Sequence, residues 1–144
     1  MIDFLHPNWL AILLATLSTF VVGTLWYNPK TLGNLWMREA GIDPTHPDFT
    51  KGMGKIFSGA FLMGFLKSYG MALLLPAVPH MIGEGKGALG IFAVFLCITL
   101  MVTSYGTHYL FERKSFKLFL IHAGHDLAEL GVICLVLWTV MRGW

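Results

Sequence analysis

The stretch FKLFLIHAGHDLAELGVICLVLWTVM, residues 116–141, decides the fold of this chain. It is long and apolar enough to cross a bilayer, which takes about 20 residues of helix. Yet it carries an ionisable stripe, which we define as His122, His125, Asp126 and Glu129. An ionisable side chain at the bilayer centre costs about 3 kcal/mol on insertion scales. We therefore expect the ionisable stripe to face protein or a polar cavity rather than lipid.

The spacing of the ionisable stripe places its members on one side of a helix. At about 100° per residue, the four positions fall within an arc of roughly 100°. The other side of the same helix carries small residues, which let a neighbouring backbone approach closely. They are Gly124, Ala128 and Gly131. We therefore predict that this helix is central in the fold.

The composition of the whole chain indicates a membrane protein. Of 144 residues, 56% are hydrophobic and 12% are charged, whereas soluble domains average about 25% charged residues. Apolar runs predict four spans, at about 8–26, 55–77, 87–111 and 116–141, and a short amphipathic surface helix at about 29–40 in the first long connection. The predicted fold is an all-α integral membrane four-helix bundle, one transmembrane domain over residues 1–144. A net charge of +2 gives no indication of nucleic-acid binding.

Basic residues are distributed unevenly over the connections. Seven lie in or beside the connections 27–54 and 112–117, and two lie on the other side. The seven are Lys30, Arg38, Lys51, Lys55, Arg113, Lys114 and Lys117, and the two are Lys86 and Arg142. Positively charged connections stay in the cytoplasm. The sequence therefore predicts an inner-membrane protein with both termini outside and these two connections cytoplasmic.

Lys67 is an ionisable residue near the middle of the second predicted span. It lies twelve residues from Lys55 at the basic end, and Glu129 lies thirteen residues from Phe116 at the basic end of the last span. The second and fourth spans run in the same direction, so the two side chains are expected at one depth. A lysine this far from an interface is predicted to pair with Glu129 or Asp126.

Other polar and aromatic residues receive simpler interpretations. Tyr105, Tyr109 and the threonines of the third span are predicted to form hydrogen bonds between helices. Tyr27 is assigned to an aromatic belt at the membrane interface. His108 is expected at a helix end. Small residues recur every four positions in the first two spans and predict close helix packing there. They are Ala11, Ala15, Thr19 and Gly23, then Ala60, Gly64, Ser68 and Ala72.

Several segments resemble a known family. They are Asn8-Trp9-Leu10-Ala11, Gly23-Thr24-Leu25-Trp26-Tyr27-Asn28-Pro29 with Gly33 and Trp36, His108-Tyr109-Leu110-Phe111-Glu112, and Phe116-Lys117-Leu118-Phe119-Leu120-Ile121. The chain resembles a bacterial membrane-protein family catalogued as domain of unknown function 1761. The resemblance implies a small four-helix inner-membrane protein and no activity. The family more often has an amide, an aromatic residue and a histidine where this chain has His122, His125 and Asp126, so it implies no two-histidine metal site.

Three interpretations of the ionisable stripe stay open. The stripe could fix polar packing in an oligomeric membrane scaffold. It could form, with Lys67, a proton-responsive transport or small-ligand binding site, which we favour. It could also bind a transition metal or haem through His122, His125, Asp126 and Glu129. We expect no catalytic residues, since the serines lack a nucleophile motif, and we expect a homo-oligomer, with a dimer favoured, embedded in lipid. The sequence names no ligand.

Overall fold

The computed structural model describes residues 7–83 and 85–141, and the regular structure within these residues is entirely helical. Within these described residues, four helical stretches are long and apolar enough to cross a membrane: Trp9–Trp26, Met53–Ile82, Lys86–Phe111 and Phe116–Met141. A short helix, α2 (Gly33–Ala40), lies in the first long connection. These elements confirm the predicted all-α fold with four spans and one short helix, and the chain is a multi-pass membrane protein.

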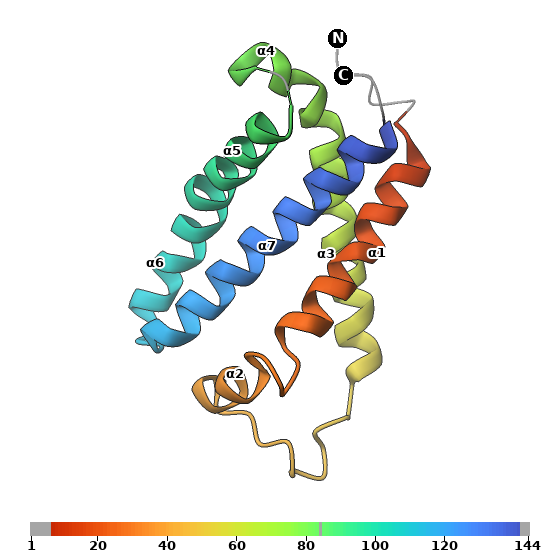
Figure 1. Ribbon diagram of the computed structural model, residues 1–144. Coiled ribbons are helices and arrows are strands. Elements are labelled where there is room, and N and C mark those ends of the chain that lie inside the picture. Colours follow the sequence, from red (N-terminus) through yellow and green to blue (C-terminus); the bar gives the residue numbers. More distant parts are fainter. Residues whose placement is uncertain (1–6, 84, 142–144) are drawn as a thin grey trace.

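The last span, α7 (Phe116–Met141), occupies the centre of the bundle, as predicted. It runs between α1 (Trp9–Trp26) on one side and α5 (Lys86–Leu96) on the other (Figure 1). Its inner side contributes Leu130, Ile133 and Leu137 to the hydrophobic core. Its outer side exposes leucines, which suits contact with lipid: Leu120, Leu127 and Leu135.

Small residues bring α1 close to its neighbours. Asn8 starts the helix by accepting a hydrogen bond from the Ala11 amide at 3.0 Å. Where α1 crosses α3 (Met53–Leu74), a Cβ on Gly64 would lie 2.9 Å from Thr19 Oγ1. Where α1 meets α7, a Cβ on Gly124 would lie 2.8 Å from the Trp26 ring. These contacts confirm close packing at two of the predicted small residues.

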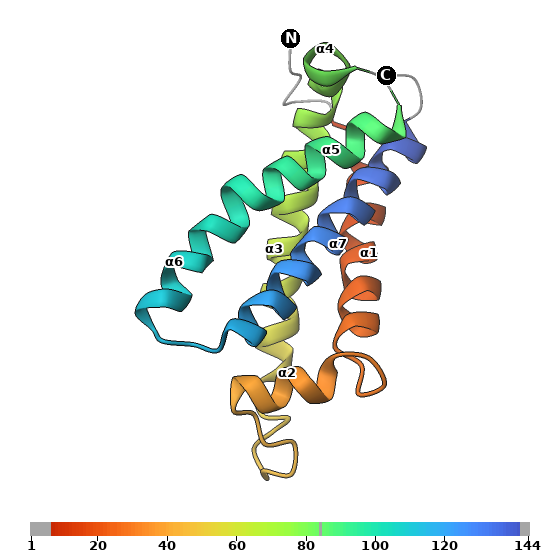
Figure 2. The same cartoon turned by 60° about the vertical axis from the view of Figure 1, so that its left-hand side comes forward.

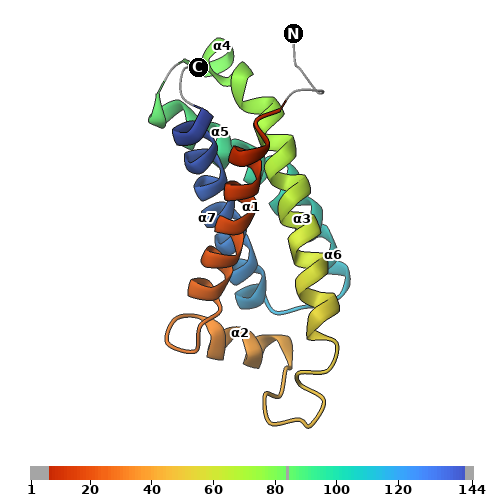
Figure 3. The ribbon, with the colours of Figure 1, turned by 90° about the vertical axis from the view of Figure 1, so that its right-hand side faces the viewer.

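The surface helix begins later than predicted, at Gly33 rather than near residue 29. Residues 28–33 instead form a compact turn, in which the Asn28 carbonyl accepts from the amides of Thr31 and Gly33, each at 2.9 Å. A Cβ on Gly33 would lie 2.3 Å from the Tyr27 carbonyl oxygen, so the turn closes only with glycine there. Figure 3 shows α2 lying across one end of the bundle. Gly41, with φ of 67°, ends α2 as expected.

The second span extends beyond residue 77, where we predicted its end. Helical structure continues from α3 through the 3₁₀ turn η1 (Leu75–Ala77) into α4 (Val78–Ile82). Pro76 and Pro79 each occupy the first turn of one of these short elements. A first-turn residue needs no amide hydrogen bond within its helix, so proline is tolerated there. The prolines therefore change the type of helix without ending the span.

The third span is divided by a π-helical segment, η2 (Cys97–Val102), between α5 and α6 (Thr103–Phe111). Along this span α5 packs closely on α7, while α6 diverges from it toward the connecting turn (Figure 2). A π segment changes which side chains of the following helix face a neighbour. Side chains of α6 and α7 line a cavity in this region.

The threonines of the third span do not form the predicted bonds between helices. Each donates to the carbonyl four residues earlier in its own helix, and each is exposed. This local bond is available to any helical threonine and satisfies the hydroxyl where no neighbouring helix is in reach. The residues are Thr99, Thr103 and Thr107.

The turn that ends α6 and the long connection that holds α2 lie at the same end of the bundle (Figure 1).

Candidate functional site

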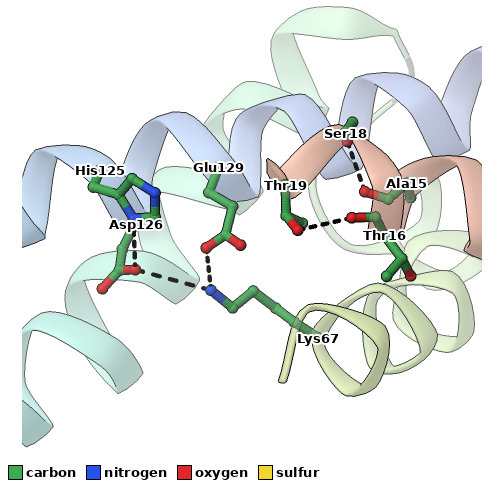
Figure 4. A network of polar contacts seen from close by, with 8 residues as sticks. All are labelled: Ala15, Thr16, Ser18, Thr19, Lys67, His125, Asp126 and Glu129. Carbon is green, nitrogen blue, oxygen red and sulfur yellow. Dashed lines mark hydrogen bonds and ion pairs between the residues drawn. The ribbon is translucent and has the colours of Figure 1, made fainter. Parts of the chain in front are cut away.

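Lys67 extends from α3 toward α7 and contacts two of its carboxylates (Figure 4). Its Nζ donates to Glu129 Oε2 and lies 3.9 Å from Asp126 Oδ1. The pairing that equal depth predicts is therefore present within one chain. Glu129 is 7% exposed, which makes it a buried charge. One ammonium group thus serves two carboxylates.

His125 lies on the other side of Asp126. Its Nδ1 is 3.5 Å from Asp126 Oδ1, which is long for a hydrogen bond between an imidazole and a carboxylate. With a neutral imidazole, the cluster of Lys67, His125, Asp126 and Glu129 carries one net negative charge. With an imidazolium, the same cluster is neutral. We call these four residues the charge cluster.

His122 has a different partner from the other members of the ionisable stripe. Its Nδ1 forms a hydrogen bond with the Tyr109 hydroxyl of α6, and which group donates depends on the imidazole tautomer. The structure therefore divides the predicted site. Three of its residues join Lys67, and His122 joins a tyrosine. His108, which we expected at a helix end, is exposed near the end of α6.

A cavity of about 340 Å³ adjoins the charge cluster. Three tyrosines, two histidines and one carboxylate line it: Tyr27, Tyr105, Tyr109, His122, His125 and Asp126. The rings follow one another around the cavity. Their centroids are 6.0 Å apart for Tyr105 and Tyr109, 5.9 Å for Tyr109 and His122, 6.4 Å for His122 and Tyr27, and 5.0 Å for Tyr27 and His125. The result is an aromatic wall with a carboxylate at its end.

Two elements hold the aromatic wall in place. The Trp26 indole donates to the Ile121 carbonyl at 3.1 Å, which fixes the end of α1 against α7. Tyr27 follows directly, and its ring packs on Trp36 of α2 with centroids 5.0 Å apart. Within the same wall, the buried Tyr105 hydroxyl makes no hydrogen bond of standard geometry among the described residues, and the Asp126 carboxylate is its polar neighbour. A buried hydroxyl without a partner is costly unless something in the cavity satisfies it.

Tyr27 was not predicted as a site residue, because its place at the end of the first span is typical of the interfacial belt. The available signal was its position, since the last residues of the first span lie at the same end as the first half of the last span. Tyr105 and Tyr109 were expected to form hydrogen bonds between helices. Tyr109 does so with His122, and Tyr105 faces the cavity.

The predicted metal ligands are only partly gathered. One ligand atom each from His125, Asp126 and Glu129 lies within 4.8 Å of the others. However, the Lys67 ammonium already binds Glu129 and lies near Asp126, so a cation at that point would have to displace it. The geometry therefore favours an ion pair here over metal coordination.

Outside the spans, a hydrogen bond links the surface helix to the start of α7. Ser115 Oγ donates to Glu39 Oε2 at 2.5 Å. This hydrogen bond, with the nearby charges of Lys117 and Arg38, holds the pKa of the Glu39 carboxyl below its usual range, against a smaller opposing effect of desolvation. The contact fixes α2 beneath the helix that carries the charge cluster.

Comparison with protein families gives a match over residues 10–138 to the family described as Protein of unknown function (DUF1761). The matched region includes every residue of the charge cluster and of the aromatic wall. The comparisons with curated proteins and with solved structures gave no match.

Proposed function

Since the chain belongs to the family described as Protein of unknown function (DUF1761), a description that names no activity, we propose its function from the site alone. The protein has a proton-responsive binding site for a small molecule, placed within the bilayer where it can support transport. The observation that carries the proposal is the sharing of one lysine between two carboxylates beside a cavity.

The charge cluster needs one more positive charge. A net charge within a membrane is costly, so a proton or a bound cation must balance the second carboxylate. His125 is the side chain placed to share that proton with Asp126, because its Nδ1 lies 3.5 Å from Asp126 Oδ1. The empty site is therefore neutral when His125 and Asp126 share a proton, and it is negative without that proton.

The cavity beside Asp126 has the size and lining of a binding site for a small molecule. Small-molecule pockets generally measure about 300–1,000 Å³ and combine aromatic walls with a few polar groups. The cavity, at about 340 Å³, has five aromatic or imidazole rings and the Asp126 carboxylate. A purely structural role would be fulfilled by Lys67 and Glu129 alone. It would require neither a second carboxylate nor a cavity beside it.

The proposal is tested by counting protons. Purified protein in lipid nanodiscs is brought from pH 8 to pH 5.5, and proton uptake is measured with an indicator dye. We expect wild type to take up about one proton more than Asp126→Asn, since the variant leaves a balanced pair of Lys67 and Glu129. Asp43→Asn is the matched control. Hydrogen bonds from Thr45 hold the pKa of Asp43 below its usual range, so it stays ionised throughout. Equal uptake by wild type and Asp126→Asn would overturn the proposal.

We also propose that the end of the bundle bearing α2 faces the cytoplasm of a bacterial cell and that the protein lies in the inner membrane. The basic residues of the described connections support this orientation; Arg142, on the opposite side, lies outside the described residues. The variant Lys51→Cys should react with an impermeant maleimide in inside-out vesicles and not in right-side-out ones, and wild type, whose Cys97 and Cys134 are buried, is the control.

The homodimer expected from the sequence stays a prediction. It was expected because a bundle of four helices has little interior in which to hide five ionisable groups. Lys67 contacts Glu129 within one chain, which counts against that reason. Native mass spectrometry from nanodiscs measures the oligomeric state directly, and a dimer would show that association has another cause.

A further inference from the structure

We propose that the small molecule bound in the cavity is an organic cation with an ammonium head group, held by the aromatic wall and by Asp126. This inference rests on the proposed function, because it names the class of ligand for the same site. In it, the ligand and the proton compete for one negative charge, so that binding of the cation releases the proton.

The aromatic wall is suited to a diffuse positive charge. The face of an aromatic ring attracts a cation within about 6 Å of its centroid, and several rings together form a cage for alkylated ammonium groups. Tyr27, Tyr105 and Tyr109 contribute their rings from two different helical regions to one cavity. Phenol rings are uncharged, so they attract a cation but do not neutralise its positive charge.

The balancing charge comes from Asp126. It lines the cavity, whereas Glu129 lies behind it and is already bonded to Lys67. The groups that face Asp126 come from every neighbouring element: Lys67 on α3, Cys97 on η2, Tyr105 and Tyr109 on α6, Tyr27 after α1, and His122, His125 and Glu129 on α7. Of these, Lys67 is the one side chain with a fixed positive charge. Because Lys67 also pairs with Glu129, it balances the negative charge of Asp126 only in part, and the rest of that charge can attract a cationic ligand.

Other ligand classes fit less well. An anion would enter a site that has one negative charge in excess when His125 is neutral. An uncharged ligand could pack on the rings, but the negative charge of Asp126 would still need the proton to balance it. A small inorganic cation would gain little from three tyrosine rings. An alkylated ammonium ion uses both the rings and the carboxylate.

The probe for the test is choline, measured by isothermal titration calorimetry on the full-length protein in nanodiscs. The matched control ligand is the uncharged isostere of choline, in which carbon replaces the quaternary nitrogen. We expect choline to bind wild type at pH 6.5 and its isostere to bind at least about 10-fold more weakly, corresponding to about 1.4 kcal/mol. Titration in buffers of different ionisation enthalpy should show release of about one proton per choline bound.

Two variants of one residue separate ring chemistry from folding. Tyr27→Phe keeps the ring and should change choline affinity less than about 3-fold, whereas Tyr27→Leu should weaken it about 10-fold. Equal binding of choline and its isostere would overturn the inference, as would choline binding without proton release. If choline does not bind while the indicator experiment still shows the extra proton of Asp126, this inference fails and the proposed function stands. If neither is observed, both fail.

Discussion

Replacement of Lys67 by methionine tests whether the ion pairs within the bundle support the fold. Methionine keeps much of the length and apolar character of the lysine stem but removes the charge that serves Glu129 and Asp126. Removing one partner of a buried ion pair costs about 3–5 kcal/mol, because the other charge stays buried and unpaired. The Lys67 side chain is 23% exposed, and polar groups of unfolded membrane proteins also find partners. We therefore expect a loss of about 2 kcal/mol.

The assay is reversible unfolding in mixed micelles with increasing detergent denaturant, followed by circular dichroism. Lys55→Met is the matched control, because Lys55 is an exposed lysine near the start of the same helix. It should change the free energy of unfolding by less than about 0.5 kcal/mol. Adding Glu129→Gln to Lys67→Met removes the stranded carboxylate and should recover at least about 1 kcal/mol. Equal effects of the two lysine substitutions, or no recovery in the double variant, would refute this reasoning.

Two further predictions concern the contacts that position the site. Gly124→Ala should destabilise the protein by about 1–3 kcal/mol in the same unfolding assay, because the new Cβ would lie 2.8 Å from the Trp26 ring. Gly131→Ala is the control and should be neutral or stabilising, because a Cβ there meets nothing within 4 Å. Equal losses of stability in the two variants would contradict the packing described. Ser115→Ala should raise the pKa of Glu39 toward its ordinary value, measured by carboxyl NMR titration. A carboxyl whose pKa is lowered in the folded state stabilises the fold at pH values above the ordinary carboxyl pKa, and this stabilisation is lost as the pH falls. The variant should therefore be less stable than wild type above that pH range and equally stable in acid. An unchanged pKa of Glu39 would contradict the role given to this hydrogen bond.

The sequence predicted those features that depend on one helix or on depth in the membrane. The bounds of the last span follow from its apolar length. The pairing of Lys67 with Glu129 follows from equal depth on two helices that run in the same direction. Both depend on regular helix geometry, in which sequence separation converts directly into distance.

The aromatic wall could not be predicted in the same way. It depends on the divergence of α6 from α7, and the π segment before α6 has no signature in the residues of that stretch. It also depends on the turn after α1, which closes through a Gly33 amide and so directs Tyr27. The separate partners of His122 and His125 follow from which neighbouring helix each one meets. Helix periodicity alone does not predict such tertiary contacts.

The most direct test of a transport site is exchange across a membrane. Proteoliposomes are loaded with choline and a pH-sensitive dye and then diluted into choline-free buffer at equal pH. If the site alternates between binding a proton and binding the cation, outward movement of choline should carry protons inward and acidify the vesicles, and Asp126→Asn should abolish the signal while Asp43→Asn preserves it. Choline that binds wild type in calorimetry but leaves the vesicle pH unchanged would contradict transport by this site.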